Sequence, residues 1–126
     1  MKRLLALTAA GEAALGLILL VHPPVVVRLL FGAEIPGAGM VMSRITGIGL
    51  IALGIACWPG RDTRGSALPL FGMFAYSALT TLYLAYQGLG GEWVGRLLWP
   101  AAALHAALTA LLVRAWIKDQ RMNDQR

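Results

Sequence analysis

Four long apolar stretches dominate this sequence and limit what it can fold into. Each is close to the roughly 20 residues that a helix needs to cross a bilayer core about 30 Å thick. The chain is 58% hydrophobic and 13% charged, whereas soluble domains carry about 25% charged residues. We therefore expect an all-α integral membrane protein, an antiparallel four-helix bundle that forms one domain over residues 1–126 with spans at 4–21, 40–58, 67–86 and 97–117.

The connections between these stretches differ in character. Pro23-Pro24 should end the first helix, because proline lacks an N–H donor and forces the preceding residue out of the helical region. Within the following segment, 23–39, the run 25–31 is too apolar for a solvated loop, so we expect a short interfacial or re-entrant helix there. Residues 59–66 are few and polar, so we expect a short turn there between antiparallel neighbours.

Lysine and arginine are unevenly divided between the two ends of the predicted spans. Three lie on one side, namely Arg28, Arg44 and Arg96. Eight lie on the other side, namely Lys2, Arg3, Arg61, Arg64, Arg114, Lys118, Arg121 and Arg126. The positive-inside rule places the side with eight in the cytoplasm, together with both termini. The net charge of +5 is therefore expected to orient the protein and not to bind nucleic acid.

Three ionisable residues fall inside the predicted spans: Glu12, Arg44 and His105. A charged residue at the centre of a span costs about 2.5–3.5 kcal/mol to insert, so each needs a partner or a function. The helical rise of about 1.5 Å per residue places Glu12 and His105 near the midplane with Tyr76, and places Arg44 nearer the outer end. A polar face on the third span, expected to point inward, carries residues three and four positions apart: Gly72, Tyr76, Thr80, Tyr83 and Gln87.

These positions predict a polar core inside the bundle. Its members are Glu12, Arg44, Tyr76, Thr80, Tyr83 and His105. Two interpretations stay open: an ion pair between Glu12 and Arg44 that only fixes helix register, or a site for a ligand or for protons. One glutamate and one histidine make a poor metal site, and no nucleophile elbow, phosphate loop or CxxC is present. We expect no catalytic residue, no metal and no enzymatic activity.

Several short motifs resemble the DoxX-like group of small four-helix bacterial membrane proteins. They are Glu12, Leu30 to Gly32, Ser43-Arg44-Ile45-Thr46-Gly47, Trp99-Pro100 and His105. Some members of that group are associated with membrane oxidoreductases or quinol oxidation. The resemblance implies a protein of the bacterial inner membrane that is an accessory subunit, or that binds a quinone or another lipid. Its partners would be the lipid bilayer and a membrane complex or a second copy of itself. Apart from the resemblance, we expect Arg44 in the polar core to hold an anionic or carbonyl head group of the ligand.

The lone glutamate of the first span, Glu12, also resembles the small multidrug-resistance transporters. Those proteins use that carboxylate to exchange protons for hydrophobic cations. Arg44, His105 and the long first loop depart from their pattern. Proton-coupled transport and a purely structural bundle are therefore the alternatives to a binding or accessory protein.

Overall fold

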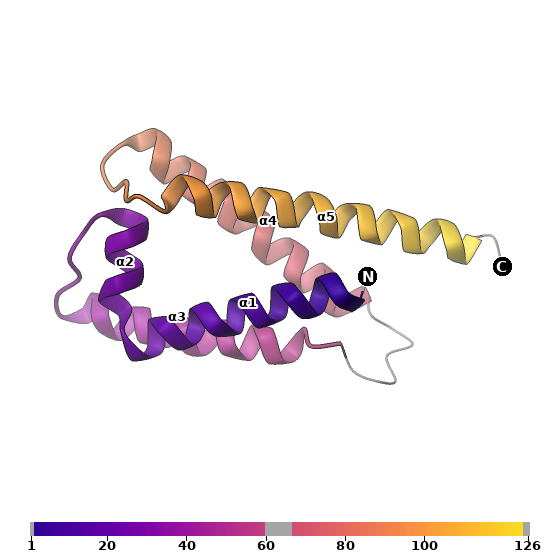
Figure 1. Ribbon diagram of the computed structural model, residues 1–126, viewed down its shortest axis with the longest axis horizontal. Helices are drawn as coiled ribbons and strands as arrows, with labels where there is room; N and C mark the ends of the chain where they lie inside the picture. Colours follow the sequence, from indigo (N-terminus) through magenta and orange to yellow (C-terminus); the bar gives the residue numbers. More distant parts are fainter. Residues whose placement is uncertain (1, 60–66, 125–126) are drawn as a thin grey trace.

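The computed structural model describes residues 2–59 and 67–124, and over these residues the chain forms five helices (Figure 1). The helices are α1 (Lys2–Val21), α2 (Pro23–Phe31), α3 (Ala38–Ala56), α4 (Ala67–Gly90) and α5 (Leu98–Asp124). Four stretches are long and apolar enough to cross a membrane: Lys2–Val21, Ala38–Ala56, Leu68–Gly90 and Leu98–Lys118. The all-helical prediction is confirmed. The predicted turn with Arg61 and Arg64, and the terminal Arg126, lie outside the described residues.

The short helix α2 follows α1 directly because of its two prolines. Pro23 and Pro24 occupy the first turn of α2, where the missing N–H groups would have had no helical partner. At the other end Gly32 adopts a φ of 68° and donates its N–H to the Arg28 carbonyl at 3.0 Å, which closes the helix with a left-handed cap. The predicted helix between the first two spans is therefore present.

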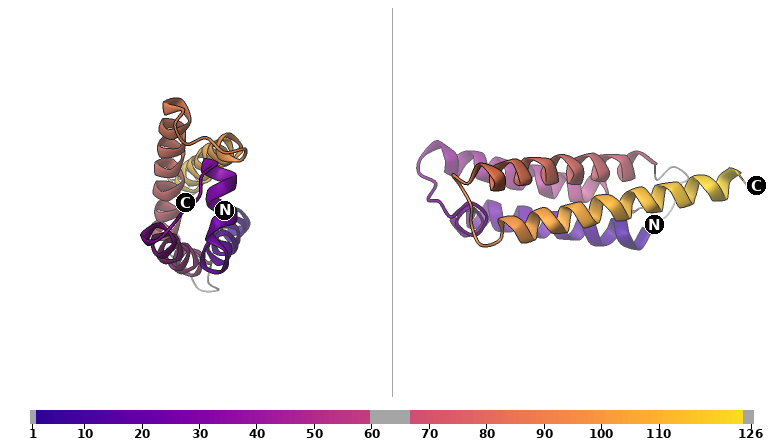
Figure 2. Two further views of the ribbon diagram at one scale, coloured as in Figure 1. Left: turned by 90° about the vertical axis from the view of Figure 1, so that its left-hand side faces the viewer. Right: turned by 90° about the horizontal axis from the view of Figure 1, so that it is seen from above.

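The four long helices are arranged as two pairs. α1 packs chiefly against α3, and α4 chiefly against α5 (Figures 1 and 2). α2 and the loop of residues 91–97 lie at one end of the molecule, and the start of α1 and the last turns of α5 lie at the other (Figure 1). The start of α1 carries Lys2 and Arg3, and the second half of α5 carries Arg114, Lys118 and Arg121.

Glycines bring α1 and α3 into backbone contact. A Cβ atom added at Gly16 would meet the Gly47 carbonyl oxygen at 2.6 Å, and one added at Gly47 would meet the Gly16 carbonyl oxygen at the same distance. About two turns further along α3, a Cβ atom added at Gly54 would lie equally close to the Ala9 carbonyl oxygen. Both helices therefore need these glycines, as is typical of close helix pairs in membranes.

The apolar core is divided into two clusters by a central layer. One cluster comprises Leu5, Ala9, Cys57, Leu70, Met73 and Leu112. The other comprises Leu19, Val26 and Leu50, and so lies toward the α2 end. Tyr76 packs against both clusters. The layer around Tyr76 is therefore the middle of the molecule, with apolar packing on either side.

Candidate functional site

Glu12 enters this middle layer from the inward face of α1. Thr8, Glu12 and Gly16 are all buried, as their spacing of four residues predicts for one helix face. Only 5% of Glu12 is exposed. Thr8 donates its hydroxyl to the carbonyls of Leu4 and Leu5 in its own helix, so it offers no donor to the carboxylate.

Tyr76 and His105 come from the second helix pair. The Tyr76 ring on α4 meets the His105 ring on α5 edge to face, with centroids 5.8 Å apart and an angle of 77°. The Tyr76 side chain lies close enough to the Glu12 carboxyl group and to Thr80 to interact with both. Tyr76 thus connects α1 with the pair of α4 and α5.

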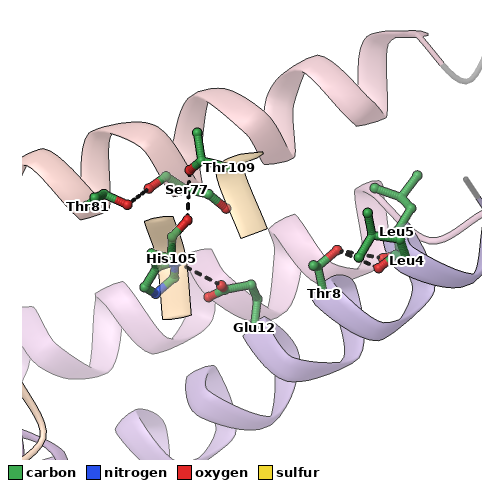
Figure 3. A network of polar contacts seen from close by, with 8 residues as sticks. All are labelled: Leu4, Leu5, Thr8, Glu12, Ser77, Thr81, His105 and Thr109. Carbon is green, nitrogen blue, oxygen red and sulfur yellow. Dashed lines mark hydrogen bonds and ion pairs between the residues drawn. The ribbon is translucent and has the colours of Figure 1, made fainter. Parts of the chain in front are cut away.

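His105 and Glu12 face one another across the boundary between the two helix pairs (Figure 3). The distance from His105 Nδ1 to Glu12 Oε1 is 4.0 Å, too long for a direct hydrogen bond. Both side chains are more than nine-tenths buried. The two groups are therefore close enough to interact electrostatically, yet neither satisfies the other.

Three buried polar atoms of this layer have no hydrogen-bond partner among the described residues: Glu12 Oε2, Ser77 Oγ and His105 Nδ1. The nearby threonines do not supply one. Thr81 donates to the Ser77 carbonyl and Thr109 to the His105 carbonyl, each at 2.8 Å, so both hydroxyls bond to backbone (Figure 3). Unpaired buried polar groups are uncommon and cost free energy. The layer is therefore only partly satisfied by the protein itself.

Two predicted members of the polar core lie elsewhere. Arg44 is exposed on α3, and Tyr83 is 58% exposed on α4. Both lie toward the α2 end, with Arg44 about 9 Å along α3 from its start. In this structure Arg44 therefore lies apart from Glu12, and a shared interior site for the two stays a prediction. Glu12, Tyr76 and His105 do meet, with Thr80 half-buried beside Tyr76.

Ser77 is the buried polar residue that the sequence prediction missed. It is fully buried on α4 and shares a face with three apolar residues, Leu70, Met73 and Leu84. The spacing of those four residues is helical and would have identified this face. The polar stripe through Tyr76 and Tyr83 instead lies at the margin of the buried face.

No protein-family model, curated protein or solved structure matches this chain. The resemblances to the DoxX-like group and to small multidrug-resistance transporters therefore stay predictions. Within residues 2–59 and 67–124, no three His, Cys, Asp or Glu side chains lie close enough together to hold a metal ion. The chemistry of the candidate site depends on a carboxyl, a phenol, an imidazole and a hydroxyl.

Proposed function

We propose that the protein is an antiparallel four-helix bundle in the bacterial cytoplasmic membrane. Large apolar side chains cover its outside: Leu7, Ile55, Leu79 and Leu89 are 72%, 70%, 67% and 81% exposed. A soluble monomer rarely exposes so much apolar surface, whereas lipid tails would cover it. The basic end of the molecule, with Lys2, Arg3 and the last turns of α5, would face the cytoplasm.

Within that membrane the protein would bind a small amphipathic ligand at the layer formed by Glu12, Tyr76, Ser77 and His105. One observation carries this proposal: three buried polar atoms that find no hydrogen-bond partner within residues 2–59 and 67–124 lie in the layer between two separately packed helix pairs. A ligand that pairs with these atoms would recover the free energy that their burial costs. A purely structural bundle has no such use for them, because its polar groups would be expected to satisfy one another.

The polar atoms of Glu12 and His105 define which ligand head group would fit. Glu12 Oε2 accepts hydrogen bonds when ionised, and His105 Nδ1 donates or accepts according to its tautomer. A quinol hydroxyl would donate to Glu12, and a quinone carbonyl would accept from His105. The apolar clusters on either side of Tyr76 would face the rest of the ligand. We therefore propose a quinone, or a lipid with a similarly small polar head, as the ligand class.

The ligand would enter between the helix pairs. Between α1 and α3 there is no room for a ligand, since even a Cβ atom added at one of the contact glycines would lie 2.6 Å from a backbone oxygen of the other helix. Glu12 and His105, in contrast, belong to different pairs and are 4.0 Å apart. A small separation of the two pairs would open the polar layer to a molecule dissolved in the bilayer.

Native mass spectrometry of gently extracted protein tests this function. The wild type should carry a small lipid-soluble molecule, which Glu12→Gln and His105→Ala lose while the control Thr46→Val keeps it. Thr46 is exposed on α3 and bonds only to the Met42 carbonyl of its own helix. Bare wild-type protein, or a molecule that all variants keep equally, would contradict a binding site at this layer. Loss of proton-coupled cation uptake in Glu12→Gln, with no bound molecule, would instead favour transport.

A further inference from the structure

A second candidate site lies at the α2 end of the molecule, far from the interior layer. A surface pocket of about 310 Å³ opens where the C-terminal end of α2 meets the loop of residues 91–97. Its lining is formed by Arg28, Leu29, Gly32, Val94, Gly95 and Arg96. Two arginines thus share one pocket with apolar side chains from both segments. We propose that this pocket binds the phosphodiester head group of an anionic phospholipid.

The backbone holds the two arginines in place. The N–H of Gly95 donates to the Leu30 carbonyl and the N–H of Leu97 donates to the Leu29 carbonyl, both at 2.8 Å. A Cβ added at Gly95 would collide with the Leu29 carbonyl oxygen and lie 2.6 Å from the Leu30 carbonyl carbon, so only glycine permits this approach. The loop is therefore attached to the end of α2, and Arg96 is held at the same pocket as Arg28 although the two residues are 68 positions apart in the sequence.

The guanidinium groups keep donors free for a phosphate. Arg28 forms an ion pair with Glu34 at 2.6 Å, but the two side chains are 63% and 75% exposed. An exposed pair of this kind contributes little stability, about 0–1 kcal/mol. Arginine has five N–H donors in a planar fork that suits phosphate oxygens. Glu34 is not among the residues that line the pocket, so it competes for Arg28 without occupying the site.

The surroundings favour a lipid over a soluble phosphate. Leu29 and Val94 are 40% and 41% exposed at the pocket, and they would contact the glycerol and the first carbons of acyl chains. Trp93 lies in the loop and Trp99 in the first turn of α5, and both are about half exposed, as is usual at the head-group level of a membrane. The pocket also lies at the end where α1 and α4 finish and α3 and α5 begin (Figure 1). An amphipathic ligand fits this combination of charge, apolar contact and depth.

This inference rests on the membrane placement proposed above, but it is independent of the interior ligand site. Its test is a native mass spectrometry titration of the full chain with phosphatidylglycerol and with phosphatidylcholine. The wild type should bind phosphatidylglycerol more tightly by about tenfold. Arg28→Gln/Arg96→Gln should remove this preference, while Arg114→Gln, a change of an exposed arginine near the opposite end, should keep it. Glu12→Gln should also keep it, which separates failure here from failure of the interior site.

A gain of affinity provides the second arm, since it needs no damage to the fold. Glu34→Gln should strengthen phosphatidylglycerol binding, because it releases Arg28 from its ion pair. Excess inorganic phosphate should leave the bound lipid in place. The proposal is overturned if the double variant keeps the preference, if Arg114→Gln removes it equally, if Glu34→Gln leaves binding unchanged, or if inorganic phosphate displaces the lipid.

Discussion

Glu12 Oε1 and His105 Nδ1 lie 4.0 Å apart in the middle of the molecule, each on a different helix pair and each more than nine-tenths buried. This distance exceeds a hydrogen bond, and Glu12 Oε2 and His105 Nδ1 have no partner among the described residues. Breaking a fully formed buried pair is strongly destabilising. Glu12 and His105, in contrast, are held apart, so a polar group of a ligand could interact with both side chains. The predictions below follow from this arrangement and from the packing that holds it.

Glu12 and His105 should be energetically coupled. Residues that share a polar network show interaction free energies of about 0.5–3 kcal/mol in double-mutant cycles. We expect the cycle of Glu12→Gln with His105→Asn to give a value in this range for the free energy of unfolding in detergent. The control cycle pairs Glu12→Gln with Thr46→Val on the exposed face of α3. Additivity in the first cycle, to within about 0.3 kcal/mol, would show that the two side chains do not interact.

Gly47→Ala should destabilise the protein, whereas Gly49→Ala should not. A Cβ at Gly47 lies 2.6 Å from the Gly16 carbonyl oxygen and 2.8 Å from the Leu20 nitrogen, both backbone atoms that cannot turn away. At Gly49, on the same helix, nothing lies within 4 Å. Overpacking costs about 1–3 kcal/mol, measured here by unfolding in detergent. Equal stability of the two variants would show that α1 and α3 do not cross at these glycines.

Ser77→Ala should leave the ligand-free protein as stable as the wild type or more so. The Ser77 hydroxyl is fully buried and has no hydrogen-bond partner in the part of the chain that the structure describes, and removal of such a group relieves a desolvation cost of about 1–3 kcal/mol. Thr109→Val, which removes a hydrogen bond to the His105 carbonyl, should instead lower stability by about 0.5–1.5 kcal/mol. Thermal unfolding of both variants measures the contrast. A loss of stability in Ser77→Ala would mean that its hydroxyl has a partner within the fold.

Arg44→Gln should have little effect on the interior site. Arg44 is exposed, and surface substitutions away from special features usually change the free energy of unfolding by less than about 0.5 kcal/mol. The bound molecule and the midpoint of thermal unfolding should match those of the wild type. If Arg44→Gln released the bound molecule as completely as Glu12→Gln does, Arg44 would have to reach the interior in the ligand-bound state.

The orientation in the membrane is tested with cysteines placed at the two ends of the bundle. Cys57, the only cysteine of the chain, is 3% exposed and can be replaced by alanine as a background. A cysteine at the exposed position Glu92 should react with an impermeant maleimide in intact cells. One at the exposed position Gln120 should react only after the membrane is opened. The reverse pattern would place the basic end outside.

Helix positions were largely predictable because they depend on local chemistry. Apolar length set the four long helices, and Pro23-Pro24 set the boundary between α1 and α2. The inward face of α1 was also readable, since Thr8, Glu12 and Gly16 are polar or small at a spacing of four in an otherwise apolar helix. Such a pattern can be recognised in the sequence of one helix, without knowing which other helices pack against it.

The composition of the site was less predictable because it depends on how helices rotate against each other. Arg44 shares a spacing with Gly47, Leu50 and Gly54, yet only the last three are buried. In the proposed membrane placement, the long Arg44 side chain could extend to the membrane surface, whereas the glycines pack against α1. Ser77 was hidden for the opposite reason, because its small side chain lies among Leu70, Met73 and Leu84. The contact between the loop of residues 91–97 and α2 has no signal in the sequence besides its glycines.

A ligand head group between Glu12 and His105 can be located by photo-crosslinking with a photoreactive quinone in native membranes, followed by peptide mapping. Crosslinks should concentrate on the segments around Glu12, Tyr76 and His105, and they should be suppressed by excess unmodified quinone and lost in Glu12→Gln. Crosslinks spread over outward-facing positions such as Leu79 and Leu82, unaffected by competitor or by Glu12→Gln, would contradict this placement, because those side chains are 67% and 68% exposed and would face only lipid.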